Sequence, residues 1–399
     1  MSVICLMLFM TISVLSSSLS IKSALDSQLD KFTPVDVNLY KPAYLPESYV
    51  NSYTEQTIYY TEEQKEDSKK PISYTLETNG YDINTLKDIV EIPIYAIPEW
   101  TLAYSLGDYY ETTKSQYPML SYEISESIIK ISDYNKIAEL YGEEKYILND
   151  DEYIVLCNYE QMLDIRNQTL GANSNIEING KTYHSKYKEC QDGFVFMATT
   201  EINAGIILVP DNFELKDEWI EQYFLVANYN AETEEGKQEI ENTLIGSGDT
   251  EFFENIKEKG INLDGSSKIS ITESSKGLAT IIIFIAIYLG VVFLIASSAI
   301  LALKQLTESS DNKQRYTILR KIGCDEKMIN QALFRQIFIF FMMPLILAMI
   351  HSIFGIKFIL SMLEVLASPD ELLPSIIVTA VIIGVIYGIY FLATYFGSK

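Results

Sequence analysis

The side chains in this sequence that could perform chemistry are a glycine–lysine pair, scattered serines and two histidines. A Walker A phosphate loop needs glycine, four residues and then Gly-Lys-Ser/Thr, because backbone amides and the lysine must surround the phosphate together. Gly236-Lys237 is followed by Gln238 and lacks the upstream glycine. His184 lies in a polar region and His351 in an apolar run, which excludes a His-rich or two-histidine zinc site. The sequence therefore predicts no catalytic, cofactor or metal site, and any ATP hydrolysis must come from a partner chain.

Four long uncharged runs are the elements that must hold the functional residues of the chain in place. Gly277 to Leu303 holds 27 residues without a charge, and as a helix it would extend roughly 40 Å, more than the roughly 30 Å hydrocarbon core of a bilayer. Gln336–Ile356 and Leu372–Ser398 are similar runs. Met1–Ile21 is also uncharged but has no basic flank, so a retained helix is favoured over a cleaved signal peptide. These runs predict four transmembrane helices.

The loop between the second and third of these helices fixes the orientation. Residues 304–335 contain seven Lys and Arg residues, the densest basic cluster in any short loop of the chain. By the positive-inside rule this loop is cytoplasmic. Counting spans outward from it puts Met1 and Lys399 inside the cell and residues 357–371 outside, together with the large segment 25–275. We therefore expect a multi-pass cell-membrane protein with an extracytoplasmic domain.

The same topology removes a serine-hydrolase interpretation. Ser127 with Lys130, and Ser185 with Lys188, fit the S-x-x-K spacing, and Ser310-Asp311-Asn312 fits the companion S-D-N motif of penicillin-binding enzymes. The two motifs fall on opposite sides of the membrane. They cannot form one active site, and a membrane-anchored surface enzyme lacks any catalytic constellation.

Charge is distributed very unevenly. Residues 22–276 hold 47 of the 54 acids and 21 of the 30 bases, a net charge of −26, whereas the rest of the chain holds seven acids and nine bases. Such a field excludes nucleic acid and favours cationic ligands such as basic peptides, although acidity kept for solubility alone is the favoured alternative. Only Cys157 and Cys190 could share an oxidising compartment, and the sequence leaves open whether they are bridged.

The extracytoplasmic segment reads as an α+β domain. Strands are predicted at Ser127–Ile131, Tyr153–Cys157, Gly193–Thr199 and Gly205–Pro210. Ser132 and Asp133 are N-cap types for a helix that ends at Gly142. Helices are also predicted at Glu214–Phe224 and Glu232–Leu244, and the charged run Glu62–Lys70 is predicted to be a solvated loop. The overall prediction is an integral membrane α-helical protein, with domains at 1–24 (first span), 25–275 (outer α+β domain), 277–303, 304–335 (cytoplasmic loop), 336–356, 357–371 (outer loop) and 372–398.

The basic loop is the remaining constellation. Lys304 to Ile322 can continue the second span as a helix that stops at Gly323, and Asp325 is a suitable N-cap for the helix that follows. Its mixed-charge surface, with Ile318 and Ile322 four residues apart, suits docking in a groove of another protein. On these grounds alone, an ordinary charged loop that only sets topology is equally favoured.

The order of motifs in this loop resembles the cytoplasmic signature of FtsX-like ABC transporter permeases, and those of BceAB-type antimicrobial-peptide exporters of Gram-positive bacteria are closest in character. The motif residues are Glu308, Asp311, Tyr316 and Leu319, followed by Arg320-Lys321-Ile322-Gly323. In the outer domain, Ile131–Asn135, Leu140–Gly142 and Asp151–Tyr153 resemble the same group. One span, a large outer domain and three more spans is also the MacB-like topology.

The resemblance implies a permease subunit without catalytic residues or cofactor. In that family the cytoplasmic loop helix engages a separate ABC ATPase, so residues 304–327 would be the coupling region and the eight motif residues the coupling site. The expected partners are this ATPase, membrane lipid and a further permease chain, because BceAB-type permeases have more than four spans and this chain looks like the C-terminal portion of one. The expected function is export, removal or sensing of an amphipathic compound such as a peptide antibiotic. The alternative is a non-transporting receptor or scaffold whose outer domain binds a ligand or cell-wall enzyme.

Overall fold

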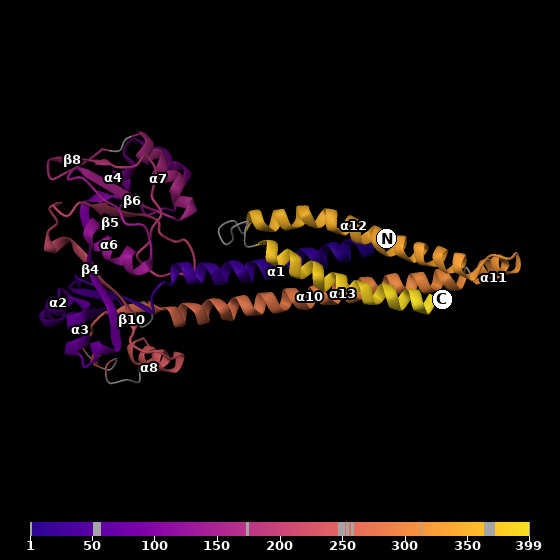
Figure 1. The fold of residues 1–399 in the computed structure, drawn as a ribbon. Helices are drawn as coiled ribbons and strands as arrows, with labels where there is room; N and C mark the ends of the chain where they lie inside the picture. The colour runs from indigo at the N-terminus through magenta and orange to yellow at the C-terminus, as the bar shows by residue number, and fades with distance from the viewer. Residues whose placement is uncertain are drawn as a thin grey trace. The chain divides into compact units, whose positions relative to one another are not determined.

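The computed structural model describes residues 2–50, 57–172, 175–245, 252, 255–256, 259–311, 313–362 and 372–398. The chain divides into two compact units, which are labelled by element in Figure 1. A helical unit comprises Met1–Gln28 and Ser274–Lys399, and an α/β domain comprises Leu29–Glu273. The first membrane helix and the helix at residue 268 each cross the boundary between these units, so the domain is inserted between two membrane helices.

The helical unit contains the predicted membrane spans. Among the described residues, four helices are long and apolar enough to cross a bilayer. Their buried side chains form a common core around Leu8, Leu294, Ile337 and Phe341. The chain is therefore an integral membrane protein with an α/β domain, which confirms the predicted fold class. The helices are α1 (Ser2–Phe32), α10 (Lys268–Asp311), α12 (Glu326–Met362) and α13 (Leu372–Ser398), with the short α11 (Lys313–Lys321) between α10 and α12.

Two glycines allow α1 to lie close to its neighbours. A Cβ atom on Gly290 of α10 would lie 2.7 Å from Cγ of Leu15, and one on Gly355 of α12 would lie 2.7 Å from Cε2 of Phe9. Small residues at such crossings let helix backbones approach closely in lipid, where packing replaces the hydrophobic effect as the main cause of association. The Thr11 hydroxyl of α1 adds a polar contact 3.3 Å from the Gly290 carbonyl oxygen.

The α/β domain is built on a mixed sheet. In the part of the chain that the structure describes, nine strands pair in the order β11-β1-β10-β4-β5-β9-β6-β8-β7, and β5/β9 and β6/β8 are the parallel pairs. A separate hairpin is formed by β2 (Ser48–Val50) and β3 (Thr57–Tyr59). The strands of the large sheet are β1 (Val37–Pro42), β4 (Leu86–Thr101), β5 (Ser125–Lys130), β6 (Glu152–Leu156), β7 (Asn175–Ile178), β8 (Lys181–Ser185), β9 (Ile206–Val209), β10 (Ile220–Tyr229) and β11 (Asp264–Ser267).

Helices and side chains cover both faces of this sheet. Ile129 and Leu208 belong to one buried cluster, while their chain neighbours Ile128 and Ile207 belong to another on the opposite face. Strands buried on both faces appear as continuous apolar runs, which is why residues 205–210 were recognisable in the sequence. The helices of the domain are α2 (Glu62–Ser68), α3 (Ile72–Thr78), α4 (Leu102–Leu106), α5 (Tyr110–Gln116), α6 (Ile131–Tyr141), α7 (Glu160–Ala172) and α8 (Glu234–Leu244), with 3-10 turns at Ile83–Thr85, Gly107–Tyr109 and Asp217–Trp219.

The edge of the sheet joins the two points where the chain enters and leaves the domain. Strand β1 follows α1, β11 precedes α10, and the two strands pair antiparallel with Val37 opposite Ser267. The Lys268 amide at the start of α10 donates to the Asp36 carbonyl at 2.9 Å. The Asp36 carboxylate accepts from the Tyr229 amide at 2.9 Å and pairs with Lys237 at 2.9 Å. The two connections to the membrane helices are thus fixed beside each other.

Several local predictions are confirmed. The structure has strands at β5, β6 and β9 and a helix at α8, each within a few residues of the predicted bounds. Gly142 ends α6 with a positive φ of 75°, as expected of a glycine C-cap. The helix begins at Ile131, so Ser132 and Asp133 lie in its first turn and do not serve as its N-cap. The sequence left the pairing of Cys157 and Cys190 open, and both are free cysteines in the structure.

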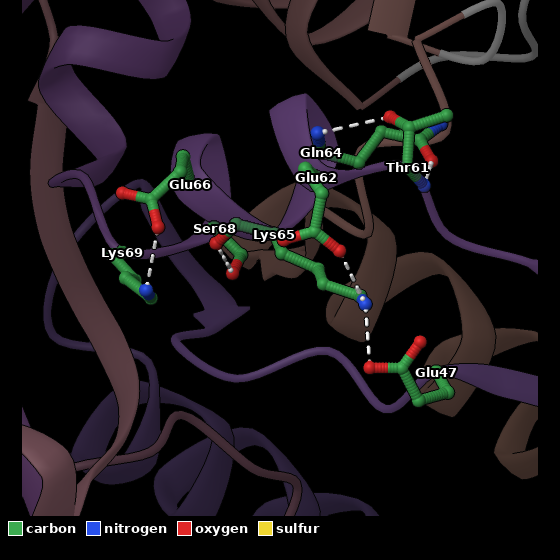
Figure 2. A network of polar contacts seen from close by, with 8 residues as sticks. All are labelled: Glu47, Thr61, Glu62, Gln64, Lys65, Glu66, Ser68 and Lys69. Carbon is green, nitrogen blue, oxygen red and sulfur yellow. Dashed lines mark hydrogen bonds and ion pairs between the residues drawn. The ribbon is translucent and has the colours of Figure 1, made fainter.

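The charged run Glu62–Lys70 was predicted to be a solvated loop, and this prediction is wrong. It forms α2, whose N-terminus carries a capping box: Thr61 Oγ1 accepts from the Gln64 amide at 3.2 Å, and Gln64 Oε1 accepts from the Thr61 amide at 2.8 Å. Lys65 Nζ lies 2.7 Å from Glu47 Oε1 (Figure 2). Charged composition alone indicated a loop, whereas the spacing of cap and ion pairs favours a helix.

The predicted helix at Glu214–Phe224 is also wrong. Residues from Ile220 onward form β10, which lies between β1 and β4 and pairs with both. Phe224, Leu225 and Val226 are fully buried, on alternate faces. Tertiary burial on both sides overrides the helical pattern of the preceding acidic residues, because β10 supplies the centre of that half of the sheet. The predicted strand at Gly193–Thr199 is absent as well, since this segment forms an irregular connection without ladder pairing.

A buried ion pair lies inside the domain beneath this irregular segment. The Arg166 guanidinium donates to both carboxylate oxygens of Glu126, at 3.0 and 2.9 Å, and its Nε donates to the Ala204 carbonyl at 2.6 Å. The two side chains are 8% and 4% exposed. Gly205 makes room for the guanidinium, because a Cβ atom there would lie 2.2 Å from Arg166 Cζ.

We expect Arg166→Met to destabilise the domain by about 3–5 kcal/mol, because it leaves the Glu126 carboxylate buried without its partner. Both tryptophans, Trp100 and Trp219, lie in the α/β domain, so denaturant unfolding of the purified chain followed by tryptophan fluorescence reports on this domain. The control is Lys136→Met, which removes an exposed pair with Asp133 and should cost less than about 1 kcal/mol. Equal losses in the two variants would contradict the prediction.

Lys41 of β1 is a buried cation with a perturbed pKa. Its ammonium donates to the carbonyls of Asp67 and Lys70 at 2.9 and 2.7 Å and to Thr75 Oγ1 at 2.9 Å. Burial lowers the pKa of Lys41 to about 8, and the charge of Glu91 offsets only part of this effect. Desolvation of the charged form therefore outweighs the hydrogen bonds that favour it.

This pKa predicts a stability that rises with pH. The folded domain releases the Lys41 proton near pH 8, while the unfolded chain keeps it until about pH 10.5, so the unfolded state binds more protons in this window. We expect the free energy of unfolding to increase by about 2 kcal/mol between about pH 7.5 and about pH 9.5. Lys41→Met should remove this increase. Identical pH dependence in the two proteins, measured by tryptophan fluorescence, would refute the assignment.

Candidate functional site

The eight residues predicted for coupling lie on the end of α10, on α11 and on the turn into α12. The turn has a defined backbone structure. Gly323 has a φ of +92°, and its amide donates to the Arg320 carbonyl at 3.1 Å while the Cys324 amide donates to the Leu319 carbonyl at 3.1 Å. These two bonds form a Schellman motif, which satisfies carbonyls that the end of α11 would otherwise leave free.

The next helix begins at once. The Asp325 carbonyl accepts from the Met328 amide at 3.0 Å, and its carboxylate lies 3.4 Å from the Lys327 amide. Asp325 is therefore the N-cap of α12, and Gly323 is the residue after the α11 C-cap, as the sequence predicted. A Cβ atom on Gly323 would meet nothing within 4 Å. Glycine is needed here for its backbone conformation and not for space.

A three-residue polar chain connects the helices that flank the turn. The Tyr316 hydroxyl of α11 donates to Gln336 Oε1 of α12 at 3.1 Å, and Gln336 Nε2 donates to Glu308 Oε1 of α10 at 3.4 Å. The structure thus brings together two predicted residues, Tyr316 and Glu308, through a third that sequence reasoning missed. Gln336 is the first residue of the predicted third span, where an amide gives no signal beyond its position after Arg335.

A salt bridge closes the turn itself. Arg320 Nε and a second guanidinium nitrogen donate to the two Glu326 carboxylate oxygens at 2.6 and 3.2 Å. Both side chains are more than half exposed, so water screens the pair and its contribution to stability is small. Its two parallel bonds nevertheless fix the direction of the Arg320 side chain. Leu319 is half-buried.

The outer surface of the hairpin tip is apolar and basic. Ile318, Ile322 and Met328 are 58%, 70% and 57% exposed, and Lys321 and Lys327 are exposed among them. Large exposed apolar side chains beside charged ones are typical of protein interaction sites. The backbone of Asp311 ends α10, and its side chain falls outside the described residues.

Gln305 of α10 is a second amide that sequence reasoning did not select. Its side chain is fully buried, and neither its oxygen nor its nitrogen has a hydrogen-bond partner among the described residues. A buried amide without partners is costly. It lies one helical turn before Glu308, so two polar side chains of α10 face the interior near the hairpin.

The described part of the hairpin holds no cluster of metal-ligating side chains. Within the described ranges, no group of three His, Cys, Asp or Glu side chains could hold a metal ion. An exposed surface on α11 is joined by hydrogen bonds to α10 and α12, two of the helices that cross the membrane.

Comparison with known proteins finds relatives of this chain among ABC transporter permeases. The chain is 35% identical over 108 residues to bacitracin export permease protein BceB of Bacillus subtilis (strain 168), a match covering 27% of this chain and 16% of that protein. It is 37% identical over 92 residues to BceB of Halalkalibacterium halodurans, which covers 23% of this chain and 14% of the relative. Over these segments the chain is similar to BceB-type ABC transporter permeases. The predicted resemblance is thereby confirmed.

The similarity extends beyond these two segments. The ABC transporter permease YvcS of Bacillus subtilis is 22% identical over 260 residues, which is 63% of this BceB-like chain and 38% of YvcS. No protein-family profile matches the chain. The matched segments span well under two thirds of the length of each of these relatives. Substrate, partner and activity of the BceB-like chain are therefore matters for proposal.

Proposed function

We propose that this BceB-like chain is a permease subunit that couples ATP hydrolysis by a separate ABC ATPase to export, removal or sensing of an amphipathic compound such as a peptide antibiotic. The relatives support the class, since two of them are named for bacitracin export. The observation that carries the coupling role is the chain Tyr316–Gln336–Glu308 beneath an exposed apolar and basic tip. Displacement of α11 by a docked ATPase would pull on α10 and α12 together.

The coupling site is assigned to Glu308, Asp311, Tyr316, Leu319, Arg320, Lys321, Ile322 and Gly323. Ile322 and Lys321 make the contact with the ATPase, Gly323 and Arg320 hold the turn, and Glu308 and Tyr316 transmit its movement to the spans. In this proposal the hairpin is cytoplasmic and the α/β domain extracytoplasmic, as the charge distribution requires. Lipid surrounds the exposed apolar faces of α10, α12 and α13, and a further permease chain completes the transporter.

The coupling role predicts that Lys321→Glu with Ile322→Asp abolishes co-purification with the co-expressed partner ABC ATPase. The reason is that the variant places two acids on the only contact surface proposed for the partner. Lys216→Glu, an equally exposed charge reversal in the α/β domain, should leave the complex intact. Recovery of the same ATPase complex from both variants would disprove the docking surface.

Arg320 needs a separate control because it also pairs with Glu326. Arg320→Glu should weaken the complex, and the exchange Arg320→Glu with Glu326→Arg restores the ion pair in reverse. If the exchange restores the complex, Arg320 acts by holding the turn, as proposed here. If it does not, Arg320 contacts the ATPase directly.

The topology predicts opposite accessibility of two positions. A membrane-impermeant maleimide added to intact cells should label Lys216→Cys in the α/β domain and leave Ile322→Cys unlabelled, both in a Cys324→Ser background. Permeabilised cells should allow both to react. The protein with Cys324→Ser alone gives the background from the remaining cysteines. Labelling of the hairpin in intact cells would invert the topology.

A further inference from the structure

The α/β domain contains a cavity that the coupling function does not use. It has a volume of about 230 Å³. Its walls are mostly apolar, with Phe32, Phe194 and Ile206 almost completely buried around it. For comparison, a dry engineered cavity of roughly 150 Å³ binds benzene. The space is therefore sufficient for one aromatic or branched side chain with a neighbouring polar group.

Two polar groups line this cavity without partners. Asn158 is 6% exposed, and its Nδ2 has no hydrogen bond among the described residues. Its Oδ1 accepts from the Asn203 amide at 2.9 Å, which fixes the orientation of the side chain and leaves Nδ2 as the free donor. Thr200 Oγ1 lines the same cavity and also lacks a partner. A buried donor without an acceptor costs free energy that a bound carbonyl would recover.

The irregular segment 192–205 forms one side of the cavity and is held in place by side chains. The hydroxyls of Tyr141 and Tyr146 donate to the Val195 and Asp192 carbonyls at 2.7 and 2.9 Å. The Ala198 amide donates to the Phe32 carbonyl at 3.2 Å. These bonds explain why the segment does not form the strand predicted for it. Its backbone groups bond to these side chains and to Phe32, and the segment encloses one side of the cavity.

Acidic side chains cluster beside the cavity around a single lysine. Lys31 Nζ lies 3.3 Å from Asp192 and 3.8 Å from Glu201, and it also lies 5.0 Å from the centre of the Phe32 ring that lines the cavity. Glu201 lies between two lining residues in sequence. Burial, and then the charge of Asp192, raise the pKa of nearby Glu143. Burial likewise raises the pKa of Glu201. Asp192 and Glu201 thus share one ammonium, and Glu143 adds a third carboxylate nearby, which leaves local negative charge.

We propose that this cavity is the ligand site of the α/β domain and that it binds a cationic amphipathic peptide. An apolar side chain of the peptide enters between Phe32 and Phe194, a peptide carbonyl accepts from Asn158 Nδ2, and a basic group pairs with Glu201 and Asp192. The inference deepens the proposed function. It rests on that function only for the biological reason why a peptide would be bound. Binding is measurable without the ATPase, so failure of this site would leave the coupling role intact, and the converse also holds.

The probe is N-acetyl-phenylalanyl-arginine amide, titrated calorimetrically into the purified full chain in detergent without ATPase. We expect saturable binding with a Kd on the order of 0.1 mM. The glutamine analogue should bind about five-fold more weakly and the glutamate analogue about ten-fold more weakly, because the rim repels negative charge. Absence of saturable binding for all three peptides would overturn the proposal.

Two substitutions test the cavity itself. Ala198→Leu fills it and should weaken binding at least about ten-fold while the unfolding midpoint stays unchanged or rises. Asn158→Asp keeps the acceptor for the Asn203 amide and removes only the free donor, so it should weaken binding of the uncharged glutamine analogue about five-fold. A folded Ala198→Leu protein that binds with unchanged affinity would refute the site.

The rim is tested by charge neutralisation. Glu201→Gln should reduce the preference for arginine over glutamine about three-fold and leave binding of the glutamine analogue unchanged. Glu234→Gln, on the exposed start of α8, is the matched control and should alter neither value. An unchanged preference in Glu201→Gln would remove the cationic part of the proposal.

Discussion

The pairing of β1 with β11 is the constraint on which the connection between domain and membrane helices depends. Because one strand follows α1 and the other precedes α10, their ladder holds two membrane helices to adjacent points of a single sheet edge. The Asp36 carbonyl and carboxylate add bonds to Lys268, Tyr229 and Lys237 at the same place. A change in the separation of these helices must therefore be borne by the sheet or must break backbone hydrogen bonds that burial makes costly.

At the other end of α10, hydrogen bonds between side chains again connect the helix to its neighbours. Gln336 bonds to both Tyr316 and Glu308, so three helices meet at one amide. The Schellman turn at Gly323 satisfies the Leu319 and Arg320 carbonyls at the end of α11. A continuous helix of 44 residues lies between this network and the sheet edge. This helix is hydrogen-bonded near its start through the Lys268 amide and near its end through the Glu308 carboxylate.

Several buried polar side chains have no hydrogen-bond partner among the described residues. Most buried polar groups in proteins are hydrogen-bonded, so the exceptions need an explanation. Asn158 and Thr200 lie in a cavity with a charged rim, and Gln305 lies one helical turn before Glu308 in α10. By contrast, the Arg166 guanidinium donates to both carboxylate oxygens of Glu126 in the same domain.

The sequence alone determined the membrane helices, through the length of the uncharged runs, and their predicted orientation, through the positive charge of one loop. It also determined the helical hairpin, through Gly323 and Asp325. Each of these features depends on local composition or on the backbone preferences of single residues. The same local signals placed β5, β6, β9 and α8. They failed where distant contacts decide: residues from Ile220 onward became the central strand β10 because β1 and β4 lie on either side, and residues 193–199 stayed irregular because tyrosine hydroxyls and Phe32 occupy their backbone groups. The partners of Tyr316, Arg320 and Asn158 were likewise set only by tertiary packing, since hydrogen bonds between helices and loops depend on three-dimensional proximity that sequence spacing does not encode.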